Sequence, residues 1–327
     1  MTGVLVTGGS GFIGQHLVAT LIASGRPTRI LDLHPPGPAL AKAEYVKGSV
    51  LDPVLVDDAL NDIEEVYHLA GLPGMWLPHK DDFHAVNCRG TETVIAAARK
   101  RGISRLLHCS TESILFRASP SEAGAAEDTL PSVEDMPGLY TRSKLLAEQV
   151  AVQAAASGFP VVIGSPTMPI GPDDHNLTPT AAMLRYFLKR RLQFYLDFIV
   201  NLVDVRDVAT GLVLAMERGQ IGHRYILGGE SIPLRQLLEF VAEVSGRRSL
   251  RMPIPGRLAQ MTTCIMETIA DHITHCPPSG TVEGVRIALR STALSTETAR
   301  CELGYAPRPI EPALRKTIAH LAGADHA

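Results

Sequence analysis

The stretch TGGSGFIG, residues 7–14, decides the fold that the sequence predicts. It contains the spacing G-x-G-x-x-G, which is informative when it follows a strand and opens a helix. Both conditions hold, because an apolar run at residues 4–6 precedes it and Ile13, Leu17 and Leu21 recur after it at steps of four. The stretch therefore predicts a βαβ unit in which backbone amides at a helix N-terminus bind the pyrophosphate of a dinucleotide.

Short apolar runs alternate with helical periods along the first half of the chain. Strands are expected at residues 4–6, 29–32, 66–70, 105–109 and 161–163, with helices near 87–101 and 139–157. Strands that are separated by helices pair in parallel and are covered by helices on both faces. The predicted fold class is therefore α/β, a doubly wound parallel sheet of the Rossmann type.

The second half of the chain is less regular. Proline and glycine become frequent after residue 166, which favours loops over continuous sheet. We expect a dinucleotide-binding Rossmann domain over residues 1–165 and a smaller, mainly substrate-binding lobe over residues 166–327. Some segments of this lobe, at about residues 200–228, are expected to return to the Rossmann sheet.

Length and charge limit the classes of protein to consider. The chain has 327 residues, a formal net charge of −3 and no basic stripe, so nucleic acid is not an expected partner. No charged N-terminal segment precedes an apolar one, and no run of about twenty apolar residues occurs, so neither a signal peptide nor a transmembrane segment is expected. The five cysteines are scattered without a C-x-x-C spacing, which is typical of reduced thiols in a cytoplasmic protein.

Tyr140 and Lys144 are four residues apart and therefore lie on one face of the expected helix. A phenol has a pKa of about 10, and a neighbouring ammonium favours the phenolate and brings that pKa towards a range useful for proton transfer. Upstream, Ser110 and Thr111 follow the strand at 105–109, where a doubly wound sheet has its ligand crevice. A hydroxyl there can bind a substrate carbonyl, with Thr111 the preferred donor. Surface Tyr/Lys pairs without chemistry show the same spacing.

Asp32 stands at the end of the second expected strand, about twenty residues beyond the glycine stretch. A carboxylate there accepts hydrogen bonds from both ribose hydroxyls of NAD and repels the 2′-phosphate of NADP. The sequence therefore favours NAD over NADP. An aspartate in a plain turn would look the same.

The glycine stretch, Asn87, the pair Ser110-Thr111 and Tyr140-x-x-x-Lys144, in this order and spacing, resemble the extended short-chain dehydrogenase/reductases. This is the NAD-dependent epimerase/dehydratase family. Within it, the chain is similar to hopanoid-associated sugar epimerases and dihydroflavonol reductase-like members. The segments that carry this second resemblance are residues 72–77 (LPGMWL), 87–91 (NCRGT), 166–172 (PTMPIGP), 201–209 (NLVDVRDVA), 225–230 (YILGGE) and 302–309 (ELGYAPRP). The resemblance covers nearly the whole chain and implies an NAD(P)-dependent enzyme.

The resemblance also implies a role for each residue of the site. Tyr140 would transfer the proton, Lys144 would activate it, and Thr111 would hold the substrate oxygen with Ser110 beside it. The cofactor would contact Gly8, Ser10, Gly11, Phe12, Ile13, Gly14, Asp32, Ser49, Val50, Leu69, Ala70, Gly71, Asn87, Tyr140, Lys144 and Pro166.

Three positions depart from the family pattern. Ser49 stands where the family usually has an aspartate beside the adenine. Thr111 replaces the commoner serine and keeps the hydroxyl. Asp32 stands where relatives of the subgroup often carry an arginine for NADP, which again favours NAD.

Two reactions fit these residues. A dehydrogenase or ketone reductase would transfer hydride at a secondary alcohol or ketone carbon and release a product of changed redox state. An NAD-retaining sugar epimerase or dehydratase would oxidise its substrate and reduce it again. Residues 164–169 (GSPTMP) lack the R-x-x-N-x-Y-G-P pattern of nucleotide-sugar epimerases, which favours the reductase. A non-enzymatic dinucleotide sensor would often lose Tyr140 or Lys144, and both are present.

A small-molecule substrate and a second copy of the chain are the expected partners. The substrate would be a sugar derivative or a hydrophobic ketone or alcohol. By the resemblance, the helices that contain Asn87 and Tyr140 would form a four-helix bundle in a homodimer. No metal is expected, because the spacing of His272, His275 and Cys276 fits no common zinc site. Trp76 either packs over the substrate or anchors its loop.

An apolar stripe follows the helix expected at residues 257–275. It consists of Leu258, Met261, Ile265, Met266, Ile269 and Ile273. Such a stripe is more often part of a core than a membrane-facing surface, so we expect it in the core of the lobe.

Overall fold

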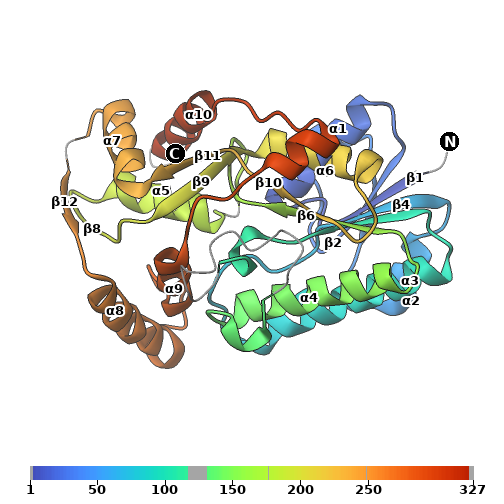
Figure 1. Cartoon of the computed structure of the whole chain (residues 1–327), viewed down its shortest axis with the longest axis horizontal. Coiled ribbons are helices and arrows are strands. Elements are labelled where there is room, and N and C mark those ends of the chain that lie inside the picture. Colours follow the sequence, from blue (N-terminus) through green and yellow to red (C-terminus); the bar gives the residue numbers. More distant parts are fainter. Residues whose placement is uncertain (1–2, 117–130, 176, 248, 324–327) are drawn as a thin grey trace.

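The computed structural model describes residues 3–116, 131–175, 177–247 and 249–323. Its centre is a sheet of seven parallel strands in the order β10-β6-β5-β4-β1-β2-β3 (Figure 1). The strands are β1 (Gly3–Thr7), β2 (Thr28–Asp32), β3 (Glu44–Lys47), β4 (Ile63–His68), β5 (Arg105–Cys109), β6 (Val161–Pro166) and β10 (Arg224–Leu227). Successive strands run outward from β1 in one direction and then, from β4, in the other. This reversal confirms the predicted doubly wound fold and puts the ligand crevice beside β1 and β4.

Helices cover both faces of this sheet, as Figure 1 shows. The helices are α1 (Phe12–Ala23) and α6 (Val205–Arg218) on one face, and α2 (Pro53–Ala59), α3 (Gly90–Lys100) and α4 (Leu139–Ala156) on the other. Each face buries its own core. The first core includes Val4, Leu17, Leu212 and Tyr225, and the second includes Val66, Val94, Leu106 and Ala151. The central strands are buried on both sides, which is why they are nearly continuous apolar runs in the sequence.

The rest of the chain forms a smaller lobe at one end of the sheet (Figure 1). Its strands are β7 (Met168–Ile170), β9 (Ile199–Asp204) and β11 (Glu230–Pro233) in one sheet, and β8 (Leu192–Tyr195) and β12 (Leu250–Pro253) in a separate pair. Its helices are α5 (Pro179–Lys189), α7 (Leu234–Ser245), α8 (Gly256–Ile269), α9 (Val282–Arg290) and α10 (Glu311–Gly323). Between β9 and β11 the chain returns to the large sheet as β10. The division of the chain after residue 165 stays a prediction.

The expectation that the apolar stripe at 257–275 lies in the lobe core is wrong. All six side chains of the stripe are exposed, from 41% for Met266 and Ile269 to 72% for Ile273. The residues of α8 that are buried are Ala259 and Thr263. Amphipathic spacing marks one face of a helix as apolar, but it does not say which face the protein covers. Within the described ranges, the helices lack the combination of length and apolar character that is needed to span a bilayer.

Candidate active site

The glycine turn packs closely against the end of β4. Gly8 has a left-handed φ of 72°, and a Cβ atom at this position would lie 2.6 Å from the backbone nitrogen of Ala70. A Cβ at Gly14 would meet the carbonyl of Gly8. Gly11 is the N-cap of α1 and has no side chain to bond the first amides of the helix. The turn therefore leaves a helix N-terminus that a phosphate can approach closely.

Asp32 lies directly beside this turn. Its carboxylate accepts hydrogen bonds from the backbone N–H of Ser10 (3.0 Å) and from that of His34 (3.0 Å). These two bonds hold the negative charge at the end of β2, next to the helix N-terminus. An aspartate of a plain turn would bond only its own neighbours, whereas this one bonds a residue 22 positions away.

Ser49 and Val50 follow β3 at the next strand end. The Ser49 hydroxyl accepts a hydrogen bond from the backbone N–H of Leu51 (3.1 Å). Val50 is buried and packs against Gly90, where a Cβ atom would lie 2.7 Å from its methyl group. The serine thus shapes a turn at the edge of the crevice.

Asn87 connects the loop after β4 to helix α4. Its carboxamide oxygen accepts from the backbone N–H of Leu72 (2.7 Å), next to Gly71, and its amide nitrogen donates to the hydroxyl of Ser143 (2.9 Å). Asn87 is buried, within the π-helix η2 (Phe83–Arg89) that precedes α3. Its contacts are those of a residue that positions the loop at Gly71 and Leu72 against α4.

Tyr140 and Thr111 meet at the carboxyl edge of the sheet. The phenol of Tyr140, the second residue of α4, lies close enough to the side chain of Thr111, which follows β5, for that side chain to lower its pKa. Burial outweighs this effect and raises the pKa of Tyr140 above its ordinary value. Tyr140 therefore keeps its proton at neutral pH.

Lys144 lies one turn further along α4. Its ammonium donates a hydrogen bond to the backbone carbonyl of Cys109 (2.8 Å), and burial lowers its pKa. The sequence predicted that this ammonium would lower the pKa of Tyr140. In the structure burial outweighs any such effect, since the net shift of the Tyr140 pKa is upward.

A role for Glu112 was not predicted from the sequence, because its acid–base character depends on burial, which the sequence alone does not show. Its carboxyl is buried and accepts a hydrogen bond from the Thr111 hydroxyl (3.3 Å). Burial raises its pKa to about 7. A carboxyl that titrates near neutrality beside Thr111 and Tyr140 is a second acid–base group at this edge.

Glu283 of α9 was also missed, and it bonds the start of α4. Its carboxylate accepts from the backbone N–H of Tyr140 (3.1 Å) and of Thr141 (2.7 Å), and from the Thr141 hydroxyl (2.7 Å). It therefore serves as the N-cap that Gly138 cannot provide. No local signal could reveal this contact, because the partners are more than 140 residues apart.

Three hydroxyl groups at the ends of β5 and β6 are buried without a hydrogen-bond partner among the described residues. They belong to Ser110, which follows β5, and to Ser165 and Thr167, which flank Pro166. Buried polar groups are nearly always hydrogen-bonded, so an unpaired set in one place is typical of a site that bonds a polar ligand.

Trp76 anchors its loop to the lobe. The indole N–H donates to the carboxylate of Asp271 (2.7 Å), and the Lys80 ammonium both pairs with Asp271 (2.9 Å) and lies over the indole ring. Asp271 belongs to the short π-helix η6 (Ala270–Thr274) that continues α8. Within the described residues, no cluster of His, Cys, Asp or Glu has the geometry to hold a metal ion.

Comparisons with known proteins agree on one family. Residues 4–228 match the NAD dependent epimerase/dehydratase family. A Synechocystis protein named "Putative dihydroflavonol 4-reductase" is 31% identical over 96% of this chain and 92% of its own length. A 2-alkyl-3-oxoalkanoate reductase of Stenotrophomonas maltophilia is 29% identical over 98% of this chain and 99% of its own. The solved structure of UDP-glucose 4-epimerase from Thermus thermophilus, a complex with NAD, has the same fold, with a TM-score of 0.75 and 23% identity over 98% of this chain and 99% of that one.

Proposed function

Because the chain belongs to the NAD-dependent epimerase/dehydratase family, we propose that it uses NAD to reduce a ketone or to oxidise the matching secondary alcohol. It is an enzyme of the NAD(P)-dependent short-chain dehydrogenase/reductase superfamily. One observation carries the proposed reaction. The adjacent side chains of Thr111 and Tyr140, with Lys144 one turn along α4, lie at the sheet edge where the glycine turn also ends.

The residues around this pair fit a dinucleotide. The close-packed glycine turn leaves the N-terminus of α1 for the pyrophosphate, and Asp32 stands where it would meet the adenosine ribose. The unpaired hydroxyls of Ser110, Ser165 and Thr167 suit the amide and hydroxyl groups of the nicotinamide half. Bound NAD would supply the hydride acceptor or donor.

The proton chemistry favours the reductive direction. Tyr140 keeps its proton, because burial raises its pKa, so it is a proton donor for an oxygen that gains negative charge. Thr111 bonds the same oxygen and orients it towards the phenol. Lys144 provides a positive charge one turn away, which stabilises the phenolate left after the transfer.

A second candidate is a redox-neutral reaction of a sugar derivative, epimerisation or dehydration. The observation that favours it is Glu112, a buried carboxyl with a pKa of about 7 that bonds Thr111. Such a reaction needs a group that moves a second proton, and a carboxyl with a pKa near the working pH suits that task.

A hydrophobic ketone or alcohol is the substrate class that we favour. Support comes from the relative named for reduction of 2-alkyl-3-oxoalkanoates, which matches this chain over nearly its full length. It also comes from residues 164–169, which lack the arginine and asparagine of the nucleotide-sugar pattern.

Turnover of hydrophobic ketones and keto-sugars, followed by the absorbance of NADH, tests the reaction. We expect net oxidation of NADH by the wild-type chain. For Tyr140→Phe we expect kcat to fall by about 10²- to 10⁴-fold with the affinity for NAD nearly unchanged, because only the proton donor is lost.

The matched control is Tyr186→Phe, which likewise removes a phenol hydroxyl, but on α5, outside the site. Turnover of a sugar substrate without net change in NADH would contradict the reductase and support the redox-neutral candidate. Substantial activity of Tyr140→Phe would mean that another group moves the proton.

A further inference from the structure

The pair of strands at the far end of the lobe exposes one apolar face. β8 and β12 pair in parallel, with Leu192 beside Leu250 and Phe194 beside Met252. Side chains alternate across a strand, so these four lie on the same face. All four are exposed, by 44% to 65%, while Gln193 between them is buried on the opposite face. We call this face, together with the apolar stripe of α8, the apolar end of the lobe.

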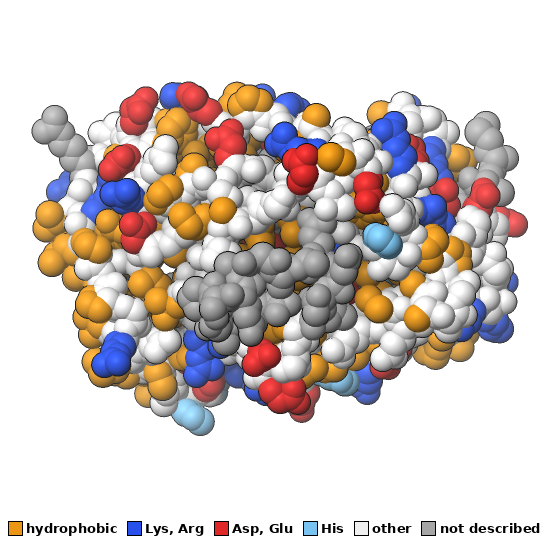
Figure 2. Space-filling model, viewed as in Figure 1, with side chains coloured by type: hydrophobic (Ala, Val, Ile, Leu, Met, Phe, Trp, Pro, Cys, Tyr) orange, Lys and Arg blue, Asp and Glu red, His pale blue; other side chains and the backbone are white. Residues whose placement is uncertain are grey.

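Helix α8 continues this surface. β12 leads through Ile254 and Pro255 directly into the helix, and Figure 2 shows hydrophobic side chains gathered along this left edge of the molecule. Most of the large apolar side chains exposed within the described residues belong to the apolar end. Both carboxylates of the helical segment have partners within the protein. Glu267 accepts from the backbone N–H of Val282, and the exposed Asp271 bonds Trp76 and pairs with Lys80.

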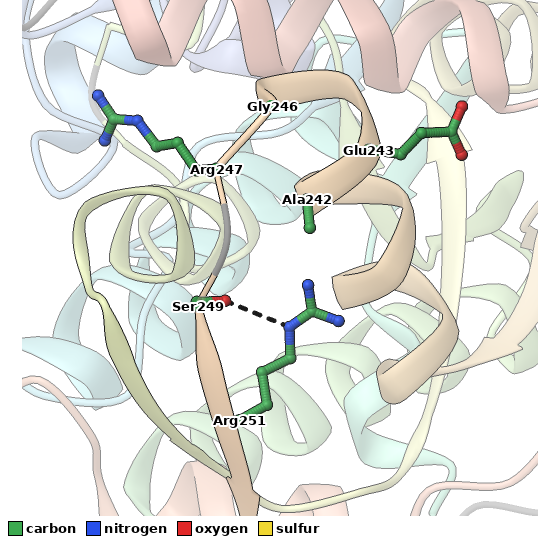
Figure 3. Close-up of a pocket in the computed structure, with 6 residues that line it drawn as sticks. All are labelled: Ala242, Glu243, Gly246, Arg247, Ser249 and Arg251. Carbon is green, nitrogen blue, oxygen red and sulfur yellow. Dashed lines mark hydrogen bonds between the residues drawn. The ribbon is translucent and has the colours of Figure 1, made fainter.

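Cationic residues are concentrated in the segments that form the apolar end: Arg257 stands next to the stripe of α8, and Arg190, Arg191, Arg247 and Arg251 line a pocket on the opposite face of the strand pair. Residues 185–196 and 246–266 together contain eight Arg and Lys residues and no Asp or Glu, in a chain whose net charge is −3. Arg190, Arg191 and Arg257 are exposed. Figure 3 shows the pocket behind β12, where Arg251 points towards α7 and Glu243 is the one carboxylate among the residues drawn.

An apolar face with basic residues beside and behind it matches one kind of partner. Apolar side chains gain by entering the acyl boundary of a bilayer, and each nearby Arg or Lys strengthens binding to a leaflet that contains anionic lipids. We propose that the apolar end of the lobe docks on an anionic phospholipid surface, with α8 lying in the plane of the interface. This docking does not depend on the redox reaction, so either proposal can fail alone.

Vesicle binding of the full chain tests the docking. Wild-type protein is mixed with vesicles of phosphatidylcholine alone and of phosphatidylcholine with phosphatidylglycerol, and the bound fraction is measured by flotation at low and high salt. We expect binding to the mixed vesicles that weakens with salt. Met261→Gln with Ile265→Gln should lower the partition coefficient by at least about ten-fold. Arg190→Gln with Arg191→Gln should lower it by about twenty-fold at low salt.

Val54→Gln is the matched control, because Val54 is a 70% exposed apolar residue of α2, which covers the large sheet and does not belong to the lobe. It should bind vesicles as the wild type does, and all variants should keep the wild-type unfolding midpoint and affinity for NAD. Failure of the wild type to bind either kind of vesicle would overturn the proposal. So would sedimentation showing a wild-type oligomer that Met261→Gln with Ile265→Gln dissociates, since a second copy would then cover this face.

Discussion

At the residue scale, the Asp32 carboxylate places a fixed negative charge beside the N-terminus of α1. This carboxylate accepts hydrogen bonds from the backbone N–H groups of Ser10 and His34, so it cannot rotate away from a ligand without losing both bonds. For Asp32→Ala we expect the ratio of kcat/KM with NAD to that with NADP to fall by about ten-fold or more, because repulsion of a 2′-phosphate disappears.

Asp58→Asn is the control for this change, since Asp58 is an exposed carboxylate of α2 outside the crevice. It should leave the ratio unchanged. A wild-type enzyme that already prefers NADP would show that Asp32 does not select the cofactor.

The raised pKa of Glu112 makes the stability of the folded chain depend on pH. Its folded pKa of about 7 lies above the value of about 4.5 for an exposed glutamate, so the native state binds the proton more tightly than the unfolded state. Stability from this group is therefore present at low pH and is lost as the pH rises from about 4.5 through 7. Glu112→Gln removes the dependence. Between pH 5 and pH 8 we expect the wild type to lose up to about 3 kcal/mol more unfolding free energy than the variant.

Urea unfolding at both values of pH measures this difference, because all other titrating groups are common to the two proteins. If the unfolding free energies of the wild type and of Glu112→Gln change equally between pH 5 and pH 8, ionisation of the Glu112 carboxyl does not destabilise the folded chain.

At the element scale, α4 depends on a cap from the other end of the sequence. Glu283 bonds the first amides of the helix that carries Tyr140 and Lys144. For Glu283→Ala we expect a loss of about 1 to 3 kcal/mol in unfolding free energy, since buried N–H groups lose their partner. We also expect kcat to fall, because the frayed turn carries Tyr140.

Glu239→Ala, at an exposed position of α7, is the matched control and should change neither quantity. Glu283→Gln retains an acceptor and should lie between the wild type and Glu283→Ala. Equal unfolding curves for all three proteins would rule out the cap as a source of stability.

The elements also show what periodicity can and cannot predict. The buried runs of β1, β5 and β6 and the helix α4 were predicted at nearly their observed bounds, because both kinds of element are buried and their spacing is therefore constrained. β3 was not predicted, since it lies at the sheet edge and reads EYVK, without an apolar run. The stripe of α8 was seen but placed in the core, because spacing gives the apolar face and not its environment.

The sequence predicted some residues of the candidate site, whereas others were revealed only by the fold. The glycine turn, Thr111, Tyr140 and Lys144 were found because their chemistry depends on local order along the chain. The contacts of Glu283 with α4 and of Trp76 with Asp271 join segments more than 140 residues apart, so only the fold reveals them. The raised pKa of Glu112 likewise depends on burial, which the sequence does not state.

At the scale of the whole molecule, side-chain contacts join the large sheet to the lobe. Trp76 ties the loop after β4 to η6 of the lobe through Asp271, and Lys80 pairs with the same carboxylate. Doubly wound sheets bind ligands at the carboxyl ends of their strands, so a substrate bound there would lie between this edge and the lobe, and the position of the lobe would set the width of the site. The homodimer expected through the helices of Asn87 and Tyr140 stays a prediction.

Asp271→Ala should therefore act on substrate binding as well as on stability. It leaves the buried indole N–H of Trp76 without an acceptor, which costs about 1 to 3 kcal/mol of unfolding free energy. Because the lobe is then held less firmly against the loop, we expect KM for the ketone to rise several-fold with a smaller change in kcat. His272→Ala, at the adjacent exposed position, should change neither quantity. A variant Asp271→Ala with lower stability and unchanged KM would show that this contact supports the fold without setting the width of the crevice.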